Sequence, residues 1–228
     1  MLTANEWMIL ATSFGVAARA VAWSLPLAIL VAYALSRPGW RGKSLFDALV
    51  HLPLLLPPVL VGFLLLLLLG RRGPLGAWLE QRFDLRLVFS AEGAAIATAV
   101  MTFPLLVRAI RLAFEGADAR LFEAAAVLRA GPLDRFFALA LPLAGPGVLA
   151  GAATAFAAGL GEFGAVITFA SNVPGETQTL PLAIYAALQA PGGEAQALRL
   201  AGLSFALAIF GLAAAEALGR WSRARLEA

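Results

Sequence analysis

The sequence contains no cysteine and only one histidine, His51. Without cysteine the chain cannot form a disulfide, use a thiol as a nucleophile or hold a metal through thiolates. One histidine does not provide a histidine-built metal site or proton relay. The GxxxxGK[ST] pattern of a phosphate-binding loop is also absent, so any ATP-driven step would take place on a separate polypeptide. We therefore expect no catalytic residues, no metal site and no cofactor.

Charged residues are scarce as well. They make up 14% of the 228 residues, whereas 61% are hydrophobic, and the mean hydropathy is +0.85. A soluble domain is about a quarter charged, and this much apolar surface in water would cause aggregation. The composition predicts an all-α polytopic membrane protein with a single transmembrane domain over residues 1–228.

The net charge of +3 does not predict a nucleic-acid partner. All but Lys43 of the 17 basic residues are arginines, and they lie at the ends of apolar runs. This distribution is typical of helices anchored at a membrane surface. We expect membrane lipid around the chain and no nucleic acid.

Long apolar runs are plentiful. A helix needs about 20 apolar residues to cross the hydrocarbon core, and the runs that meet this condition cover residues of about 9–35, 48–69, 93–112, 148–170 and 198–218. Pro26 should kink the first run. The opening stretch MLTANEWMIL lacks the basic region of a signal peptide, so we expect the first run to be retained as a span.

The arginines also predict an orientation. With five spans, one side carries Arg37, Arg41, Lys43, Arg120, Arg129, Arg135, Arg220, Arg223 and Arg225, and the other carries Arg71, Arg72, Arg82, Arg86 and Arg199. Basic residues favour the cytoplasmic side. The bias predicts a chain with its N-terminus outside and its C-terminus in the cytoplasm, and we expect a multi-pass protein of the cell inner membrane.

One cytoplasmic stretch is half polar, within the segment of about 115–146: FEAAAVLRAGPLDRFFALALPLAGPG. Glu123 and the three alanines after it favour a helix. Gly131 and Pro132 should stop that helix, and a second short helix should then run to Pro142. Such short helices have little stability alone. We expect an elbow that docks on a partner, the alternative being a surface loop that only connects two spans.

The stretches EAAAVLRAG and LALP resemble the EAA coupling motif of ABC-importer permeases, with the family spacing from Glu123 to Pro142. The resemblance implies that this elbow fits a cleft on a cytoplasmic ABC ATPase. It assigns the contact to Glu123, Ala124, Ala125, Arg129, Gly131, Leu141 and Pro142. The motif has a glycine where this chain has Arg129, and we expect Gly131 to take over the turn.

Further stretches in the same order extend the resemblance over nearly the whole chain: HLPLLLPPVLVG, GRRGPLG, FPLLVRAIRLAFEG, GLGEFGAVITFASNVPGETQTLPLAIY and APGGEAQALRL. Together they resemble the permease subunits of molybdate transporters, with sulfate/thiosulfate and tungstate permeases as relatives. The resemblance implies the type I ABC importer permease fold. Five spans are too few to enclose a wide path, so we expect two copies of the chain to pair about a two-fold axis as a homodimer. The resemblance also implies a separate ATPase, a periplasmic or extracellular oxyanion-binding protein, and import by alternating access.

Candidates for the pathway or gate are Glu162, Phe163, Gly164, Pro57 and Pro58. A carboxylate inside a span is costly and must be paired or face a polar interior. The partner of Glu162 could be Arg108, Arg19 or a backbone donor, and its role could be a gate or a fixed structural bond. The prolines free backbone carbonyls, which are tolerated only against protein or a water-filled cavity. This second span could therefore line the pathway or hold a static kink.

Several functions remain open at this stage. Molybdate, tungstate and sulfate are all tetrahedral dianions, and no residue pattern here distinguishes their sizes. A secondary transporter would usually show more spans and an internal repeat. An intramembrane enzyme would need a catalytic set near Glu162, and no such pattern is visible.

Overall fold

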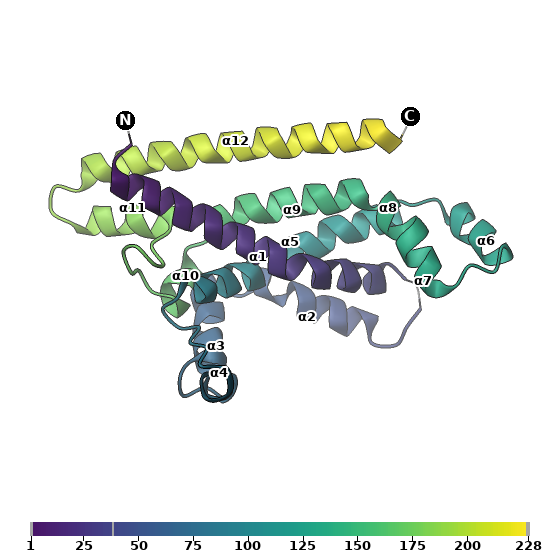
Figure 1. Cartoon of the computed structure of the whole chain (residues 1–228), viewed down its shortest axis with the longest axis horizontal. Coiled ribbons are helices and arrows are strands. Elements are labelled where there is room, and N and C mark those ends of the chain that lie inside the picture. The colour runs from purple at the N-terminus through teal and green to yellow at the C-terminus, as the bar shows by residue number, and fades with distance from the viewer. Residues whose placement is uncertain (1, 38, 227–228) are drawn as a thin grey trace.

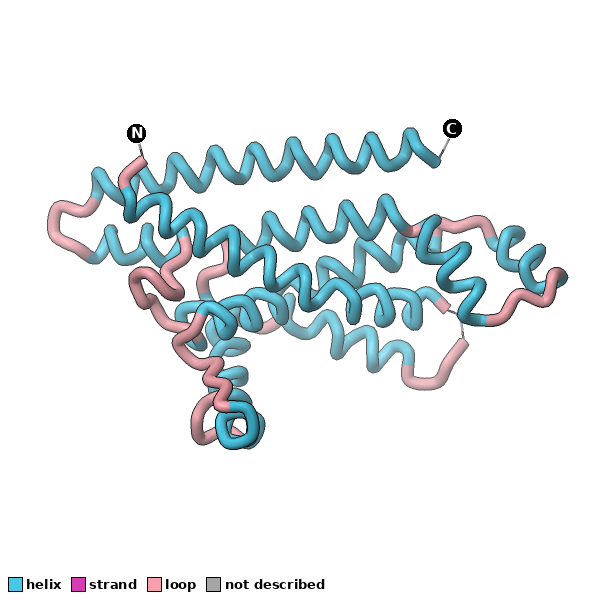
Figure 2. Tube along the Cα trace, in the orientation of Figure 1, coloured by secondary structure: helices cyan, strands magenta, loops and turns pink. Residues whose placement is uncertain are grey.

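The computed structural model describes residues 2–37 and 39–226, with the side chains of residues 212 and 214–226 left outside the description. Within the described ranges the chain is helical, with loops between the helices and no strand (Figure 2). The helices are α1 (Ala4–Ser36), α2 (Lys43–Leu55), α3 (Pro58–Leu69), α4 (Pro74–Phe83), α5 (Ala91–Glu115), α6 (Ala119–Val127), α7 (Pro132–Arg135), the π-helical turn η1 (Phe136–Ala140), α8 (Leu141–Leu143), α9 (Gly145–Leu160), α10 (Gly164–Phe169), α11 (Leu180–Gln189) and α12 (Glu194–Leu226). The expected all-α class is confirmed.

The two longest apolar helices of the first half, α1 and α5, form the centre of the bundle. Each is long and apolar enough to cross a membrane on its own. Thr3 begins α1 with a capping box, in which the Glu6 amide donates to Thr3 and the Thr3 amide donates to Glu6. Helix α1 continues through Pro26 to Ser36. These two helices correspond to the expected first and third spans.

Small residues bring α9 close to α5. A Cβ atom added to Gly147 would lie 2.3 Å from the Cβ of Ala113, and one added to Gly151 would lie 3.1 Å from the Cβ of Ala109. Glycines four positions apart on one helix face allow two backbones to approach in a membrane, where burial in lipid gives little drive for association. Side-chain volume therefore determines this helix pairing.

The expected second span, 48–69, is not one helix. Helices α2 and α3 meet at an angle of 111°. Leu56 is extended, with φ −84° and ψ 146°, because the residue before a proline is kept out of the helical region. Pro57 continues the break with φ −56° and ψ 131°. The two prolines thus separate two short helices instead of kinking one long helix.

The expected fourth span, 148–170, is also interrupted. Helix α9 ends at Leu160, and α10 begins at Gly164 after the segment Gly161–Phe163. Pro132–Leu143 and α9 form a second bent pair, at 63°, so the described residues hold two unbroken candidate spans, or up to four with the bent pairs. The expected fifth span, 198–218, falls in α12, where the side chains of residues 212 and 214–218, and of the tail arginines Arg220, Arg223 and Arg225, lie outside the described residues.

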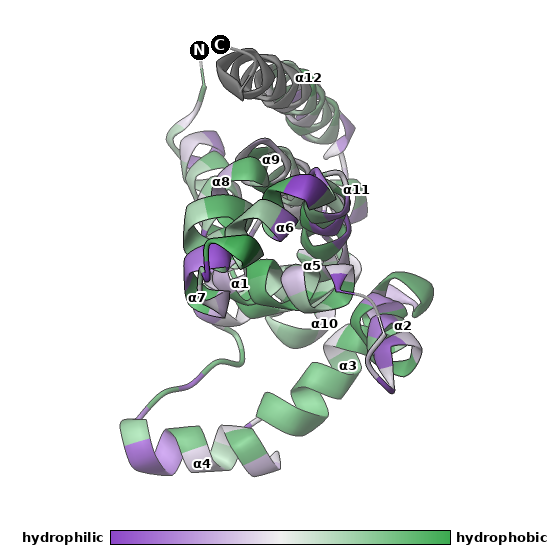
Figure 3. Ribbon diagram, turned by 90° about the vertical axis from the view of Figure 1, so that its right-hand side faces the viewer, coloured by the Kyte–Doolittle hydropathy of each residue, from purple (hydrophilic) through white to green (hydrophobic). Residues whose placement is uncertain are grey.

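Helices α1, α5, α9 and α12 run side by side along the long axis of the molecule, whereas α3 and α4 leave the bundle (Figures 1 and 3). Helix α3 is hydrophobic along most of its length (Figure 3), and only Val61 and Gly62 of its residues are buried. A helix that is apolar all round needs lipid or protein on every side. The bundle is therefore built for a membrane, and α3 offers it an uncovered apolar surface.

Two ion pairs of Glu80 hold the segment around α4. Glu80 lies 3.3 Å from Nη2 of Arg71 and 2.9 Å from Nε of Arg86. The hydrogen bond from Arg71, with the charges of both arginines, lowers the pKa of the Glu80 carboxyl. Because this pKa is lowered, the two ion pairs stabilise the fold at a pH above the ordinary pKa of glutamate. This stabilisation is lost as the pH falls through the lowered pKa.

Candidate coupling elbow and transport pathway

The elbow lies at one end of the long axis, beyond the bundle (Figure 1). Helix α12 runs toward the same end, and the N-terminus lies toward the other. The elbow consists of α6, a turn, and the continuous run of α7, η1 and α8. The structure thus has the two short helices that the sequence predicts, set apart from the bundle.

Helix α6 begins with a side-chain cap and shows several residues to the solvent. The Asp118 carboxylate accepts a hydrogen bond from the Arg120 amide at 2.9 Å, which satisfies one of the free amides at a helix start. Of the residues assigned by the motif, Glu123 and Ala124 are exposed and Ala125 is buried. Ala125 therefore faces the protein, whereas Glu123 and Ala124 are open to solvent.

Arg129 forms the turn after α6 in the left-handed conformation, with φ +59°. The Arg129 amide donates to the Ala126 carbonyl at 3.0 Å, and the Ala130 amide donates to the Ala125 carbonyl at 2.9 Å. These two bonds form a Schellman motif, whose left-handed position is usually glycine. The expectation that Gly131 takes over the turn is wrong, because Gly131 has φ −65°. Arg129 itself occupies the position of the motif's glycine.

Replacing Arg129 with glycine should stabilise this turn. A non-glycine residue in the left-handed region costs about 1 kcal/mol, which corresponds to about fivefold slower opening of the turn. Hydrogen exchange at the Ala130 amide measures this opening. In the control variant Arg120→Gly the exchange should become faster, since glycine inside α6 weakens the helix. Equal exchange in Arg129→Gly and the parent chain would contradict the assigned strain.

The second half of the elbow is fixed to the bundle by aromatic rings. Gly131 caps α7, its amide donating to Asp134 at 3.2 Å, and Pro132 occupies the first helical position. Phe136 is buried, and its ring centroid lies 4.7 Å from that of Tyr33 in α1. Tyr33 in turn stands edge-on to Phe114 of α5 at 5.3 Å. A movement of the elbow would therefore reach α1 and α5 directly.

Leu141 and Pro142, the last residues of the motif, lie where the elbow joins the bundle. Leu141 packs against the core cluster of α1, α5 and α9, and Pro142 is exposed. They belong to the same elbow as Glu123 but to its membrane end.

The most exposed apolar side chains of the elbow are at its tip. Val127 is 83% exposed, Leu128 82% and Leu133 71%. We call these three residues the elbow tip. The sequence reasoning did not single them out, because apolar residues are common everywhere in this chain. Apolar groups on a segment that stands clear of the bundle are typical of a protein–protein contact.

A cavity of about 810 Å³ separates α6 from the ends of α1 and α5. Its wall includes Glu123 and Ala126 from α6, Arg135 from α7, and Arg37 and Phe114 from the other two helices. Glu123 thus lies on the bundle side of α6, in a wall that also includes Arg37 and Arg135. The three residues of the elbow tip do not line this cavity.

The structure brings together the two sets of pathway candidates. A Cβ atom added to Gly164 would lie 2.6 Å from the Cβ of Pro58 and 3.3 Å from the amide nitrogen of Val59. A Cβ atom added to Gly62 would lie 2.6 Å from the Ala165 carbonyl oxygen. The starts of α3 and α10 therefore cross in close contact at the two breaks in the apolar runs.

Glu162 is bonded locally. Its Oε1 accepts a hydrogen bond from the Ala165 amide at 3.0 Å, at the start of α10. Of the partners that the sequence allowed, the structure selects a backbone donor, and Arg19 lies 3.6 Å from Glu92 instead. Next to it, the Phe163 ring lies 5.3 Å from that of Tyr185 in α11. The segment Gly161–Phe163 is thus a break beside the α3–α10 crossing, where Gly164 meets Pro58. Pro57 and Pro58 are both exposed.

A bundle of apolar helices with two bent pairs and a protruding elbow is the architecture of a polytopic membrane protein. The chain belongs to the family described as binding-protein-dependent transport system inner membrane components, which matches residues 24–212. The resemblance drawn from the motifs is therefore confirmed, and with it the membrane location.

Individual relatives agree over most of the chain. A molybdenum transport system permease protein, ModB, of Escherichia coli K12 is 51% identical over 225 residues, which covers 99% of this chain and 98% of the relative. The ModB protein of Haemophilus influenzae is 49% identical over 94% of this chain and 93% of its own length. The sulfate transport system permease protein CysT of Escherichia coli is 36% identical over 71% of this chain and 58% of its own length.

Proposed function

We propose that this chain is the membrane-spanning permease subunit of an ATP-driven, binding-protein-dependent importer that moves molybdate across the cell inner membrane. The observation that carries the proposal is the 51% identity, over nearly the full length of both chains, to a permease named for molybdenum transport. The sulfate relative is less similar and is matched over a smaller part of its length. Tungstate or sulfate/thiosulfate remains the second candidate cargo, because all these ions are tetrahedral dianions.

The elbow is the proposed contact with a separate ABC ATPase. Its exposed apolar tip supports such a contact, and the rings of Tyr33, Phe114 and Phe136 connect the elbow to the bundle. When the ATPase closes, it would carry the elbow with it and turn α1 and α5. The residues Glu123, Ala124, Ala125, Arg129, Gly131, Leu141 and Pro142 stay assigned to this coupling unit.

Two copies of the chain would form the pathway between them. The described residues of one chain hold only two to four candidate membrane spans. Closed two-fold pairs are the commonest oligomers. The uncovered apolar surface of α3 supports a further protein or lipid neighbour. The pathway would pass the crossing of α3 and α10, where Pro57, Pro58, Glu162, Phe163 and Gly164 gather.

The elbow and the C-terminal end of α12 lie toward the same end of the molecule. If the ATPase is cytoplasmic, this end faces the cytoplasm and the N-terminus lies outside, as the arginine distribution predicts. The opposite end would receive the oxyanion-binding protein. A secondary transporter and an intramembrane enzyme are less well supported, since neither requires an elbow of this kind.

Reconstituted uptake tests the proposal. The chain, its ATPase and its binding protein are placed in liposomes, with ATP inside and labelled molybdate outside. We expect accumulation that requires both ATP and the binding protein, that excess tungstate suppresses strongly, and that excess sulfate suppresses weakly. Liposomes without ATP are the control. Accumulation driven by a proton or sodium gradient in the absence of ATP would favour the secondary-transporter alternative.

A further inference from the structure

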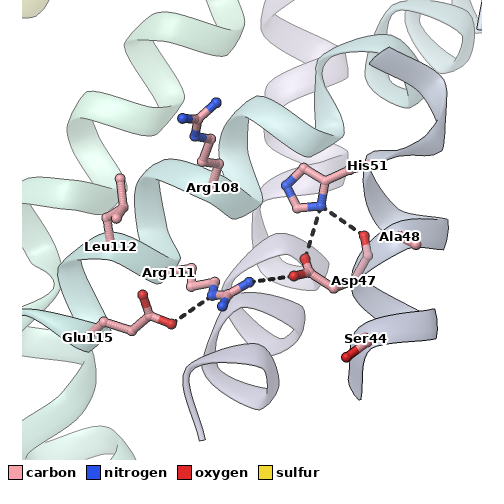
Figure 4. Close-up of a pocket in the computed structure, with 8 residues that line it drawn as sticks. All are labelled: Ser44, Asp47, Ala48, His51, Arg108, Arg111, Leu112 and Glu115. Atoms are coloured by element: carbon pink, nitrogen blue, oxygen red, sulfur yellow. Dashed lines mark hydrogen bonds and ion pairs between the residues drawn. The ribbon is translucent and has the colours of Figure 1, made fainter. Parts of the chain in front are cut away.

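A cavity of about 610 Å³, with several charged side chains in its wall, opens between α2 and the elbow-side half of α5 (Figure 4). Its ionisable and hydroxyl side chains are Ser44, Asp47, His51, Arg108, Arg111 and Glu115. The cavity lies away from the crossing of α3 and α10, and no residue of the elbow lines it.

Arg111 forms an ion pair with each of the two carboxylates of this cavity. Its Nη1 lies 2.8 Å from Oδ2 of Asp47, and its Nε lies 2.7 Å from Oε1 of Glu115. These bonds use two of the five N–H groups of the guanidinium, so three remain. His51 is held on the other side of Asp47, with Nδ1 2.9 Å from the Asp47 carbonyl oxygen and 3.1 Å from its Oδ1.

Arg108 lies one turn earlier on the same face of α5, because residues three apart on a helix are neighbours. Figure 4 shows its side chain rising from α5 across from His51. Arg108 is exposed, and over the part of the chain that the structure describes no carboxylate lies within ion-pairing distance of it. Among the described residues, Arg108 is therefore a cation of the cavity that has no ion-pair partner.

We propose that this cavity is a low-affinity site for the transported tetrahedral oxyanion as it leaves on the elbow side, with Arg108 as the contacting residue and Arg111 beside it. The inference rests on the proposed function. A planar guanidinium presents paired N–H groups that match two oxygens of a tetrahedral anion. Asp47 and Glu115 repel the same anion, and this repulsion keeps the affinity low, as release requires.

The depth of Arg108 fits this role. It lies about 10 Å before the end of α5, from the rise of 1.5 Å per residue. A phospholipid headgroup presents the same tetrahedral chemistry to an arginine near a helix end. The carboxylates of Asp47 and Glu115 favour a water-filled cavity over a lipid-facing surface, and we therefore assign the site to the free oxyanion.

Inhibition from the elbow side tests the site. Liposomes that contain the complete transporter are loaded with ATP and increasing molybdate, and the initial rate of uptake from outside is measured. Internal molybdate should inhibit the parent transporter. In Arg108→Gln the half-inhibitory concentration should rise by at least about tenfold, the loss expected for a hydrogen bond to a charged group. Arg108→Lys, which keeps the charge without the fork, should give an intermediate value and carries the test if Arg108→Gln does not assemble.

Arg41→Gln is the matched control, since it removes an exposed arginine outside the cavity. Its half-inhibitory concentration of internal molybdate should equal that of the parent. An unchanged half-inhibitory concentration in both Arg108 variants would overturn the site. The lipid is tested by replacing phospholipid with a phosphate-free glycolipid. If the difference in half-inhibitory concentration between the parent and the Arg108 variants is then lost, Arg108 contacts the headgroup, and the oxyanion site is overturned as well. A parent transporter that takes up no molybdate with ATP and binding protein would instead refute the proposed function.

Discussion

Gly164→Val is expected to reduce molybdate uptake about tenfold to a hundredfold while the ATPase stays bound to the elbow. A Cβ atom at this position would lie 2.6 Å from the Cβ of Pro58 and 3.3 Å from the Val59 backbone. Pro58 is a rigid ring and cannot turn away as a flexible side chain would. Forcing a side chain into such a contact costs about 1–3 kcal/mol, and each 1.4 kcal/mol is about a factor of ten in an equilibrium.

The valine should push α10 away from α3, and the proposed pathway requires these two helices to be in contact. Uptake in liposomes and co-purification of the ATPase are measured on the same preparation. Gly202→Val is the matched control, because a Cβ atom at Gly202 would meet nothing within 4 Å. Normal uptake by Gly164→Val would mean that the crossing tolerates separation and does not form part of the pathway.

Leu128→Asp is expected to weaken ATPase binding by at least about thirtyfold. Leu128 is 82% exposed at the elbow tip, beside Val127 at 83%. An exposed apolar residue that becomes buried in a partner's cleft is a candidate for the few positions that carry most of the binding energy, about 2 kcal/mol or more each. Aspartate would add the cost of burying a charge without a partner.

The measurement is the amount of ATPase that co-purifies with the chain from membranes in mild detergent. Leu75→Asp is the matched control, since Leu75 is a half-exposed leucine of α4, outside the elbow. Glu123→Arg is tested in parallel. Because Glu123 lines the cavity on the bundle side of α6, we expect a smaller loss from it than from Leu128→Asp. Full retention of the ATPase by Leu128→Asp would remove the tip from the contact.

The elbow illustrates what could be predicted from local sequence. Glu123 with its alanines, and the Gly131–Pro132 pair, predict two short helices with a break between them, and α6 and α7 follow this pattern. The same local rules gave the wrong turn residue. Glycine is preferred in the left-handed region, yet Arg129 adopts it, because the end of α6 after Val127 places the turn there and not two residues later.

The broken helices mark the next limit. Prolines 57 and 58 lack the backbone donors that a continuous helix needs, so the sequence predicts a disturbance in the second apolar run. It does not predict an angle of 111°. That direction is consistent with the packing of α3 against α10 through Gly62 and Gly164, residues more than 100 positions apart in the chain.

The sequence by itself determined the class of this protein: its composition indicates a membrane, the length of its apolar runs indicates membrane-spanning helices, and the EAA-like stretch marks the elbow. The tertiary structure decided which apolar residues stay exposed at the elbow tip, which glycine meets which proline, and that Arg111 pairs with Asp47 while Arg108 does not. The physical reason is range. Propensity and hydropathy act over one or two helical turns, whereas exposure, close contact and charge compensation depend on neighbours that folding brings from distant parts of the chain.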